Sequence, residues 1–340
     1  MDLALISLKQ VGIMFIMILL GFILVKLKLI DLSAKKSFSN LLVYLVVPCM
    51  IINSYNTTYD SSILINILWS FLASILLLFI GLIITFIITH FWEIDDKNIL
   101  RFALIFSNAA YMGFPLIEAM FGKEGLIYAS SFVSMFNILL WTIGYMIVSR
   151  SFNIKLAMKS IAKTPVLYAL IFGLFIFFFQ IKIPSLISSP LSLIGNMNTP
   201  LSMIITGMII ASSKIKPVLK NKYLWLTVIT RLIIIPSICL FIILLMSKLN
   251  IDSSLLKIVF ILEACPCAAI TTIFAIKFNY NEDLAASSVV ITTIFSIITL
   301  PLFTLLIGLI IWHLLTRTFN FLFLPFIAEF TFSINKNYFF

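Results

Sequence analysis

Long apolar runs alternate with short polar segments along the whole chain. Ten of these runs reach the length that a helix needs to cross the hydrocarbon core of a bilayer, about 20 residues. They cover roughly residues 8–27, 37–54, 63–90, 99–120, 125–149, 164–181, 191–211, 223–246, 255–277 and 284–312. Lipid offers no hydrogen-bond partner to the backbone, and the runs lack the strict alternation of a membrane β-barrel. The pattern therefore predicts an all-α integral membrane protein with ten transmembrane helices.

The composition excludes the common soluble classes. Of 340 residues, 62% are hydrophobic and 11% are charged, and the mean hydropathy is +1.19. A soluble domain carries about 25% charged residues. We therefore exclude a soluble enzyme and a nucleic-acid reader, and the ten runs leave no room for a sizeable domain outside the membrane.

The positions of the charges predict an orientation. The net charge is +10, and fifteen of the Lys and Arg residues lie at the loops that follow the odd-numbered runs, against seven on the other side. Cytoplasmic loops concentrate Lys and Arg. We therefore expect a multi-pass protein of the cell (inner) membrane with both termini on the non-cytoplasmic side.

The cysteines and histidines give no sign of metal or catalytic chemistry. Cys49, Cys239, Cys265 and Cys267 all lie inside apolar runs, which argues against a disulfide framework. The pair Cys265 and Cys267 lacks the second half of a zinc site, and both histidines, at positions 90 and 313, stand at the ends of predicted helices. We expect no metal, no cofactor and no catalytic residue.

Four prolines indicate an internal repeat. Pro48 and Pro115 stand 67 residues apart, and Pro200 and Pro266 stand 66 apart, so that the offsets between the pairs are 152 and 151. Two halves of five helices each would leave this trace, and an odd number of helices makes the second half inverted. Inverted repeats are a hallmark of secondary transporters. The alternative is a chance coincidence of prolines.

The repeat divides the chain into four parts. We expect a first five-helix repeat over 1–149, a cytoplasmic linker over 150–163, a second repeat over 164–312 and a C-terminal tail over 313–340. The apolar stretch of the tail is too short to span the bilayer, and we expect it either at the membrane interface or disordered.

The fourth and ninth helices are predicted to be broken at their prolines. Gly113 and Pro115 lie in the fourth and Pro266 in the ninth, and proline removes a backbone donor that lipid cannot replace. If the two breaks cross near the midplane, two half-helix N-termini point at one volume. Each such end carries about half a positive charge, so a carboxylate is the natural guest. The alternative is a pair of kinks that only shape packing.

Several residues near the predicted breaks are candidates for function. The expected substrate-binding residues are Asn108, Asn53, Gly113, Pro115, Cys265, Pro266 and Cys267, with Asn108 as the best single candidate. Ionisable groups are expensive inside a bilayer, so Glu118, Glu263 and Arg231 deserve separate attention. One interpretation is a proton-coupling carboxylate. Another is a structural ion pair, for example between Arg231 and Glu263. The remaining alternatives are exposure at the end of a span, above all for Glu118, and direct contact of Arg231 with the substrate anion. Weaker candidates for a ligand contact are Asn137, Thr206, Thr271 and Thr272.

Three passages carry a more specific pattern. They are Ser107-Asn108 followed by Met112-Gly113-Phe114-Pro115-Leu116, the small-residue stretch from Met203 through Gly207 to Ala211, and Ala264-Cys265-Pro266 continuing to Asn279 and Leu284. These passages resemble the auxin efflux carrier family, which includes the plant PIN proteins and many bacterial relatives. The likeness covers roughly residues 5–312.

The resemblance implies an architecture and a substrate class. Helices 1, 2, 6 and 7 would form a scaffold that carries the contact of a homodimer, and helices 3–5 and 8–10 would form a mobile transport unit with its crossover at Pro115 and Pro266. The family moves organic anions, auxin in plants and dicarboxylates in bacteria. Ala109-Ala110 stands where many relatives have Thr-Gly, so the plant substrate does not carry over.

The function expected from the sequence is secondary transport of a small organic anion, such as a mono- or dicarboxylate, by alternating access. A sodium- or proton-coupled carrier of the bile-acid symporter or sodium–proton antiporter type is the main alternative, since it shares the crossed helices. An antiporter would favour paired midplane aspartates, whereas every Asp lies in a terminus or loop. A membrane sensor would need a signalling domain, and an intramembrane enzyme a midplane catalytic pair.

Overall fold

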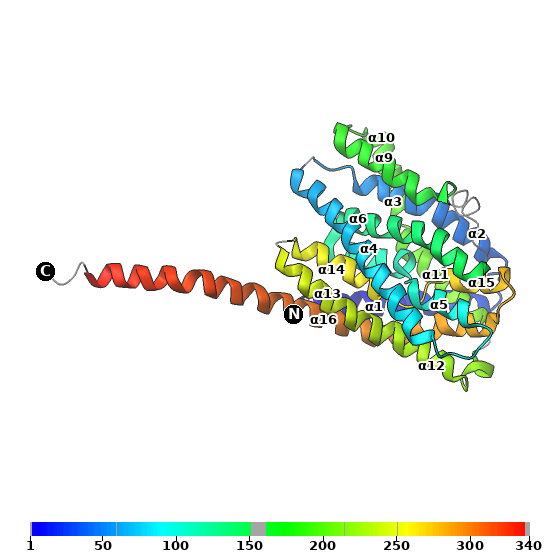
Figure 1. Cartoon of the computed structure of the whole chain (residues 1–340). Helices are drawn as coiled ribbons and strands as arrows, with labels where there is room; N and C mark the ends of the chain where they lie inside the picture. The colour runs from blue at the N-terminus through cyan, green and yellow to red at the C-terminus, as the bar shows by residue number, and fades with distance from the viewer. Residues whose placement is uncertain (1, 59, 151–160, 214, 250, 337–340) are drawn as a thin grey trace.

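The computed structural model describes residues 2–58, 60–150, 161–213, 215–249 and 251–336, with side chains except at residues 2–3 and 311–336. This part of the chain is a bundle of helices (Figure 1). The helices are α1 (Asp2–Lys26), α2 (Ala34–Leu41), α3 (Val47–Ser54), α4 (Ser61–Thr89), α5 (Lys97–Ile105), α6 (Phe114–Leu139), α7 (Tyr145–Ser149), α9 (Pro165–Phe179), α10 (Ser185–Gly195), α11 (Asn198–Ser212), α12 (Lys222–Ile229), α13 (Ile235–Met246), α14 (Ser253–Ala264), α15 (Ile270–Lys277) and α16 (Glu282–Lys336).

Four wide π-helical turns join some of these helices into longer rods. They are η1 (Leu42–Val46) between α2 and α3, η2 (Ala109–Gly113) before α6, η3 (Leu140–Gly144) between α6 and α7, and η5 (Thr230–Ile234) between α12 and α13. Three of them are followed two residues later by a proline, namely Pro48, Pro115 and Pro236. A proline removes the hydrogen bond to the residue four positions back, and the wider turn absorbs that loss without ending the rod.

Polar side chains cap the N-terminal ends of several helices. The side chain of Asp60 accepts a hydrogen bond from the N–H of Ser62 at the start of α4, and that of Asp252 accepts from Ser254 at the start of α14. The Asn221 side chain caps α12 in the same way. Each cap satisfies an N–H group that a helix leaves without an intrahelical partner. These short polar segments therefore set where the apolar helices begin.

Seven stretches of the described chain are long and apolar enough to cross a membrane. They are Ala4–Lys26, Ala34–Ser54, Ser61–Thr89, Ala109–Ser149, Ser185–Ser212, Lys222–Leu249 and Glu282–Ile310. The remaining apolar segments are shorter because α9 has 15 residues and because α5, α14 and α15 are interrupted. The seven stretches fit an integral membrane protein, and the arrangement of ten spans stays a prediction. A turn at Gly122, with φ of 64°, divides the longest stretch close to the predicted loop between the fourth and fifth spans.

Two helix pairs pack closely. The first pair is α1 with α11, which cross so closely that a Cβ atom added at Gly207 would meet the backbone of Ile18 and Phe22, and one added at Gly21 would meet the backbone of Ile204. Small residues permit such backbone contact between membrane helices. The second pair is α3 with α9, and α10 also packs against α3. These are the helices expected to form the scaffold.

The structure describes little of the predicted linker and the backbone of most of the predicted tail. Most of the predicted linker, residues 151–160, lies outside the described residues. The predicted tail begins at residue 313, yet α16 continues as one helix to Lys336 and its last part runs away from the other helices (Figure 1). The backbone of this segment is therefore helical, and the side chains beyond Ile310 lie outside the description.

Candidate functional site

Two helices stop in the middle of the bundle and resume a few residues later. The first interruption separates α5, which ends at Ile105, from η2, which begins at Ala109. The second separates α14, which ends at Ala264, from α15, which begins at Ile270. The second break follows from Pro266, because the residue before a proline avoids helical geometry; Cys265 is extended, with ψ of 154°.

The prediction that the first break lies at Pro115 is wrong. Pro115 stands inside the rod formed by η2 and α6, and Phe114 before it is helical. The π-turn of Ala109–Gly113 accommodates the proline, so the helix is not broken there. The chain is extended instead at Phe106, seven residues after the start of the fourth predicted span. Pro115 and Pro266 consequently do not occupy equivalent positions, and the crossover lies at residues 106–108 and 265–269.

The two interrupted segments bind each other through their backbones. Ser107 and Cys267 form an antiparallel bridge. The N–H of Asn108 donates to the carbonyl of Pro266 at 2.7 Å, and the N–H of Ala268 donates to the carbonyl of Phe106 at 2.9 Å. Backbone groups freed from a helix must find partners inside a membrane protein. Each break therefore supplies the hydrogen bonds that the other lacks.

Arg231 closes the C-terminal ends of both interrupted helices. Arg231 belongs to the π-turn η5, and its side chain is fully buried. Its guanidinium donates to the carbonyl of Leu104 at 2.8 Å and to that of Cys265 at 3.0 Å, and a further hydrogen bond reaches the carbonyl of Glu263. The C-terminal end of a helix carries a partial negative charge and unpaired carbonyls. One cation thus satisfies the ends of α5 and α14 together.

Arg231 also forms an ion pair with Glu263. Its Nη1 atom lies 3.1 Å from Oε1 of Glu263, and both side chains are fully buried. The other carboxylate oxygen of Glu263 meets no hydrogen-bond partner among the described residues. Of the interpretations of these residues from the sequence, the structure shows the Arg231–Glu263 ion pair. A pair of this kind leaves an uncompensated buried charge when one partner is removed.

Buried polar side chains without hydrogen-bond partners among the described residues also lie on the other side of each break, where the next helical segment begins. Nδ2 of Asn108, Oγ of Ser107 and Oγ1 of Thr271 are buried and meet no hydrogen-bond partner within the described part of the chain. Asn108 and Ser107 directly precede η2, and Thr271 lies in the first turn of α15. Buried polar groups are almost always hydrogen-bonded, so each exception needs an explanation. Donors that lie at the starts of two helical segments could receive the oxygen atoms of an anion.

The crossover brings together four of the other predicted site residues, namely Cys267, Pro266, Cys265 and Gly113. Cys267 is part of the bridge, and its N–H donates to Oγ1 of Thr292 at 3.1 Å. Pro266 accepts the hydrogen bond from Asn108, and Cys265 bonds Arg231 through its carbonyl. Gly113 packs against α14, where an added Cβ would lie 3.6 Å from Sγ of Cys265. Pro115 is buried two residues after Gly113 on the same rod, outside the two interrupted segments.

Asn53 and Glu118 are placed elsewhere. Asn53 lies in the last turn of α3, and no hydrogen bond in the described chain joins it to Asn108. Glu118 is partly exposed and lies in α6 four residues before the turn at Gly122. Glu118 forms no ion pair with Arg231, whose carboxylate partner is Glu263. Neither residue takes part in the crossover, and their functional assignment stays a prediction.

Sequence reasoning missed two polar residues. Asn198 begins α11, the helix that packs against η2, and both polar atoms of its fully buried side chain lack a partner among the described residues. Ser107 was part of the motif but not of the predicted site. The signal for Asn198 was its position two residues before Pro200, in a helix already singled out by that proline.

Two comparisons with known proteins match nearly the whole chain. The model of a family described as membrane transport protein matches residues 6–164 and 150–304. An uncharacterized transporter of Methanocaldococcus jannaschii is 24% identical over 312 residues, which cover 87% of this chain and 97% of that protein. Both matches extend over the two interrupted segments and the helices around them.

Proposed function

Because the chain belongs to the membrane transport protein family, which includes the auxin efflux carriers, we propose that it is a secondary transporter that moves a small organic anion by alternating access. The membership establishes a membrane transporter in general terms. A mono- or dicarboxylate is the proposed class of substrate. The ten-span inverted repeat belongs to the same proposal, and no cofactor is required by it.

The observation that carries this proposal is the crossover and its unpaired donors. Two interrupted helices are bonded at Ser107 and Cys267, and their following segments both start within three residues of this bridge. The first turn of a helix presents N–H groups without intrahelical partners and a partial positive charge. Nδ2 of Asn108 adds a buried donor at the same place. Together these groups favour a carboxylate over a neutral or cationic solute.

The helix pairs support a division into a scaffold and a transport unit. In this proposal α1, α2–α3, α9 and α10–α11 form the scaffold, and the remaining helices carry the crossover. Asn198 of α11 then contributes the carboxamide on the scaffold side, since α11 packs against η2. Movement of the transport unit would carry Asn108 past Asn198 and expose the anion to each side in turn. A homodimer through the scaffold and an extracytoplasmic position of both termini complete the proposal.

Arg231 favours this function over a cation-coupled carrier. A coupling cation at crossed helices would use the carbonyls at the C-terminal ends of the interrupted helices. In this chain the guanidinium of Arg231 already binds the carbonyls of Leu104 and Cys265. A second cation at this position would meet a fixed positive charge. The arrangement therefore supports anion transport without a cation at the C-terminal ends.

Replacement of Asn108 by alanine tests the proposed site. In proteoliposomes, Asn108→Ala should raise the apparent KM for carboxylate uptake at least tenfold, because a hydrogen bond to a charged group contributes about 1.5–3 kcal/mol. Folding should change little, since Nδ2 of Asn108 has no partner to lose. Uptake of labelled mono- and dicarboxylates by equal amounts of folded protein gives the measurement.

Asn137→Ala is the matched control. Asn137 is also an intramembrane asparagine, but its Nδ2 donates to the carbonyl of Val133 in its own helix at 2.7 Å. This variant should keep the wild-type KM. If Asn108→Ala and Asn137→Ala show the same uptake kinetics as the wild-type protein, Asn108 does not contact the substrate.

A further inference from the structure

A groove separate from the crossover opens on the surface of two scaffold rods. It is a shallow, open groove with a volume of about 420 Å³, and its lining residues are Tyr44, Pro48, Ile52, Lys163, Pro165, Tyr168, Ala169 and Phe172. Tyr44 comes from η1, Pro48 and Ile52 come from α3, and the other five come from α9 and the residue pair before it. The lining therefore comes from scaffold rods and not from the residues that form the crossover.

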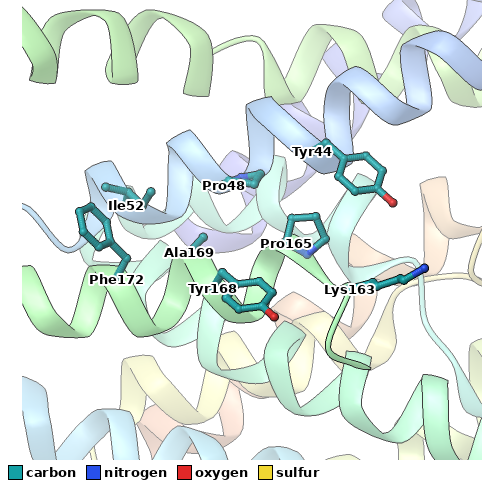
Figure 2. A pocket seen from close by; sticks show the side chains of 8 residues that line it. All are labelled: Tyr44, Pro48, Ile52, Lys163, Pro165, Tyr168, Ala169 and Phe172. Atoms are coloured by element: carbon teal, nitrogen blue, oxygen red, sulfur yellow. The ribbon is translucent and has the colours of Figure 1, made fainter. Parts of the chain in front are cut away.

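The groove has one basic end and one apolar end. Figure 2 shows Lys163 and Tyr44 at one end and Ile52 and Phe172 at the other. More than half of the surface of Tyr44, Tyr168 and Phe172 is exposed, whereas Ala169 is buried at the floor. The side chain of Lys163 is exposed and enters no ion pair among the described residues. This polarity matches a molecule with an anionic head and a hydrocarbon chain.

The surroundings add to the positive charge at that end. Lys163 is followed within two residues by the start of α9, whose N-terminal end carries a partial positive charge. Lys35 and Lys36 lie in the first turn of α2, on the same rod as Tyr44 and on the N-terminal side of it. All three lysines belong to the side of the protein that the loop charges assign to the cytoplasm. The cytoplasmic leaflet is the one that carries anionic lipids, and basic pockets between membrane helices on that side bind anionic headgroups.

We propose that this groove binds one anionic phospholipid of the cytoplasmic leaflet. The phosphate lies at Lys163, and one acyl chain runs along the aromatic wall of Tyr168 and Phe172 toward Ile52. Tyrosines are common at the level of the headgroups, where the hydroxyl is wet and the ring is apolar. The hydroxyl of Tyr168 donates to the carbonyl of Ala162 at 2.6 Å, which fixes the ring as a side wall. The assignment uses the membrane orientation proposed above and not the identity of the transported anion.

Lipid retention by the purified full chain tests the proposal. The protein in mild detergent is mixed with equal amounts of phosphatidylglycerol and phosphatidylcholine of the same chain length, and native mass spectrometry measures the fraction of protein that keeps each lipid. One basic residue near an anionic surface contributes about 1 kcal/mol, so phosphatidylglycerol should be retained about fivefold more strongly. Lys163→Ala should remove this preference, and Lys182→Ala, three residues beyond the opposite end of α9, should leave it unchanged.

A second pair of variants tests the apolar end. Ile52→Trp fills the groove and should reduce the retention of both lipids, whereas Leu186→Trp, at a position that is 86% exposed on α10, should not. The proposal is overturned if the two lipids are retained equally by the wild-type protein, if Lys163→Ala keeps the preference, or if Ile52→Trp retains both lipids. Loss of lipid whenever two copies associate would instead assign the groove to a second copy of the chain. Because none of these readouts involves uptake, failure of the lipid site and failure of the transport proposal are distinguishable.

Discussion

Replacing Arg231 by methionine should destabilise the crossover more than any comparable change elsewhere in the chain. Methionine keeps much of the side-chain volume but removes the ion pair to Glu263 and the hydrogen bonds to the carbonyls of Leu104 and Cys265. Removing one partner of a buried ion pair costs about 3–5 kcal/mol. At about 2 °C per kcal/mol, the lower end of the range for domains of 150–250 residues, the midpoint of thermal unfolding should fall by roughly 6–10 °C.

The four buried free cysteines provide the assay. Cys49, Cys239, Cys265 and Cys267 become accessible only when the helices separate, so a thiol-reactive fluorophore reports unfolding in detergent as the temperature rises. The double variant Arg231→Met/Glu263→Met should recover part of the loss, since the uncompensated carboxylate is then gone. The unsatisfied helix-end carbonyls would still cost about 1–3 kcal/mol each.

Arg101→Met is the matched control for this experiment. Arg101 is partly exposed, donates to Oγ1 of Thr89 at 2.8 Å and lies over the ring of Phe86. Its loss leaves no buried carboxylate behind, so the midpoint should fall clearly less. If Arg231→Met unfolds at the wild-type temperature, or no earlier than Arg101→Met, Arg231 does not hold the interrupted helices together.

Two further predictions concern the packing of the helices. Gly207→Leu should lower the thermal midpoint strongly, because a Cβ atom there would meet the backbone of α1 and overpacking costs about 1–3 kcal/mol or more. Gly12→Leu is the control and should not lower the midpoint, because the space around Gly12 is open. Equal midpoints would refute the close α1–α11 contact. Tyr55→Phe and Ser130→Ala each remove the 3.0 Å hydrogen bond that joins the residue directly after α3 to α6, so a double-mutant cycle of thermal stability should give a coupling of about 0.5–1.5 kcal/mol. Additive losses would mean that the two hydroxyl groups do not interact.

The sequence predicts the helical class and the positions of most helices because lipid imposes one strong constraint. An apolar run that must satisfy its own backbone can only be a helix, and caps such as Asp60 and Asp252 stand at the polar gaps between runs. The family follows from the pattern around Asn108, and the family match agrees with it. The number of spans and the inverted repeat remain predictions.

The location of the first break could not be read from the sequence. Proline suggests an interruption wherever it stands. At Pro115 a π-turn of five residues accommodates the proline and the helix continues, and the same happens at Pro48 and Pro236. The actual break at residues 106–108 is stabilised by the distant segment around Pro266. Its cause is a tertiary contact, which no local pattern records. The candidate site illustrates the same point, since Asn108 stands out in the sequence while Asn198 is recognised only from its burial and its unpaired carboxamide.

The central claim is that the crossover binds an anion, and uptake by proteoliposomes tests it most directly. A panel of labelled monocarboxylates, dicarboxylates, neutral analogues and organic cations of similar size should be offered to the wild-type protein, with and without a pH gradient. The account predicts saturable uptake of one or more carboxylates and none of the neutral or cationic analogues. Saturable uptake of a cation, or of the neutral analogue as readily as its carboxylate, would contradict it.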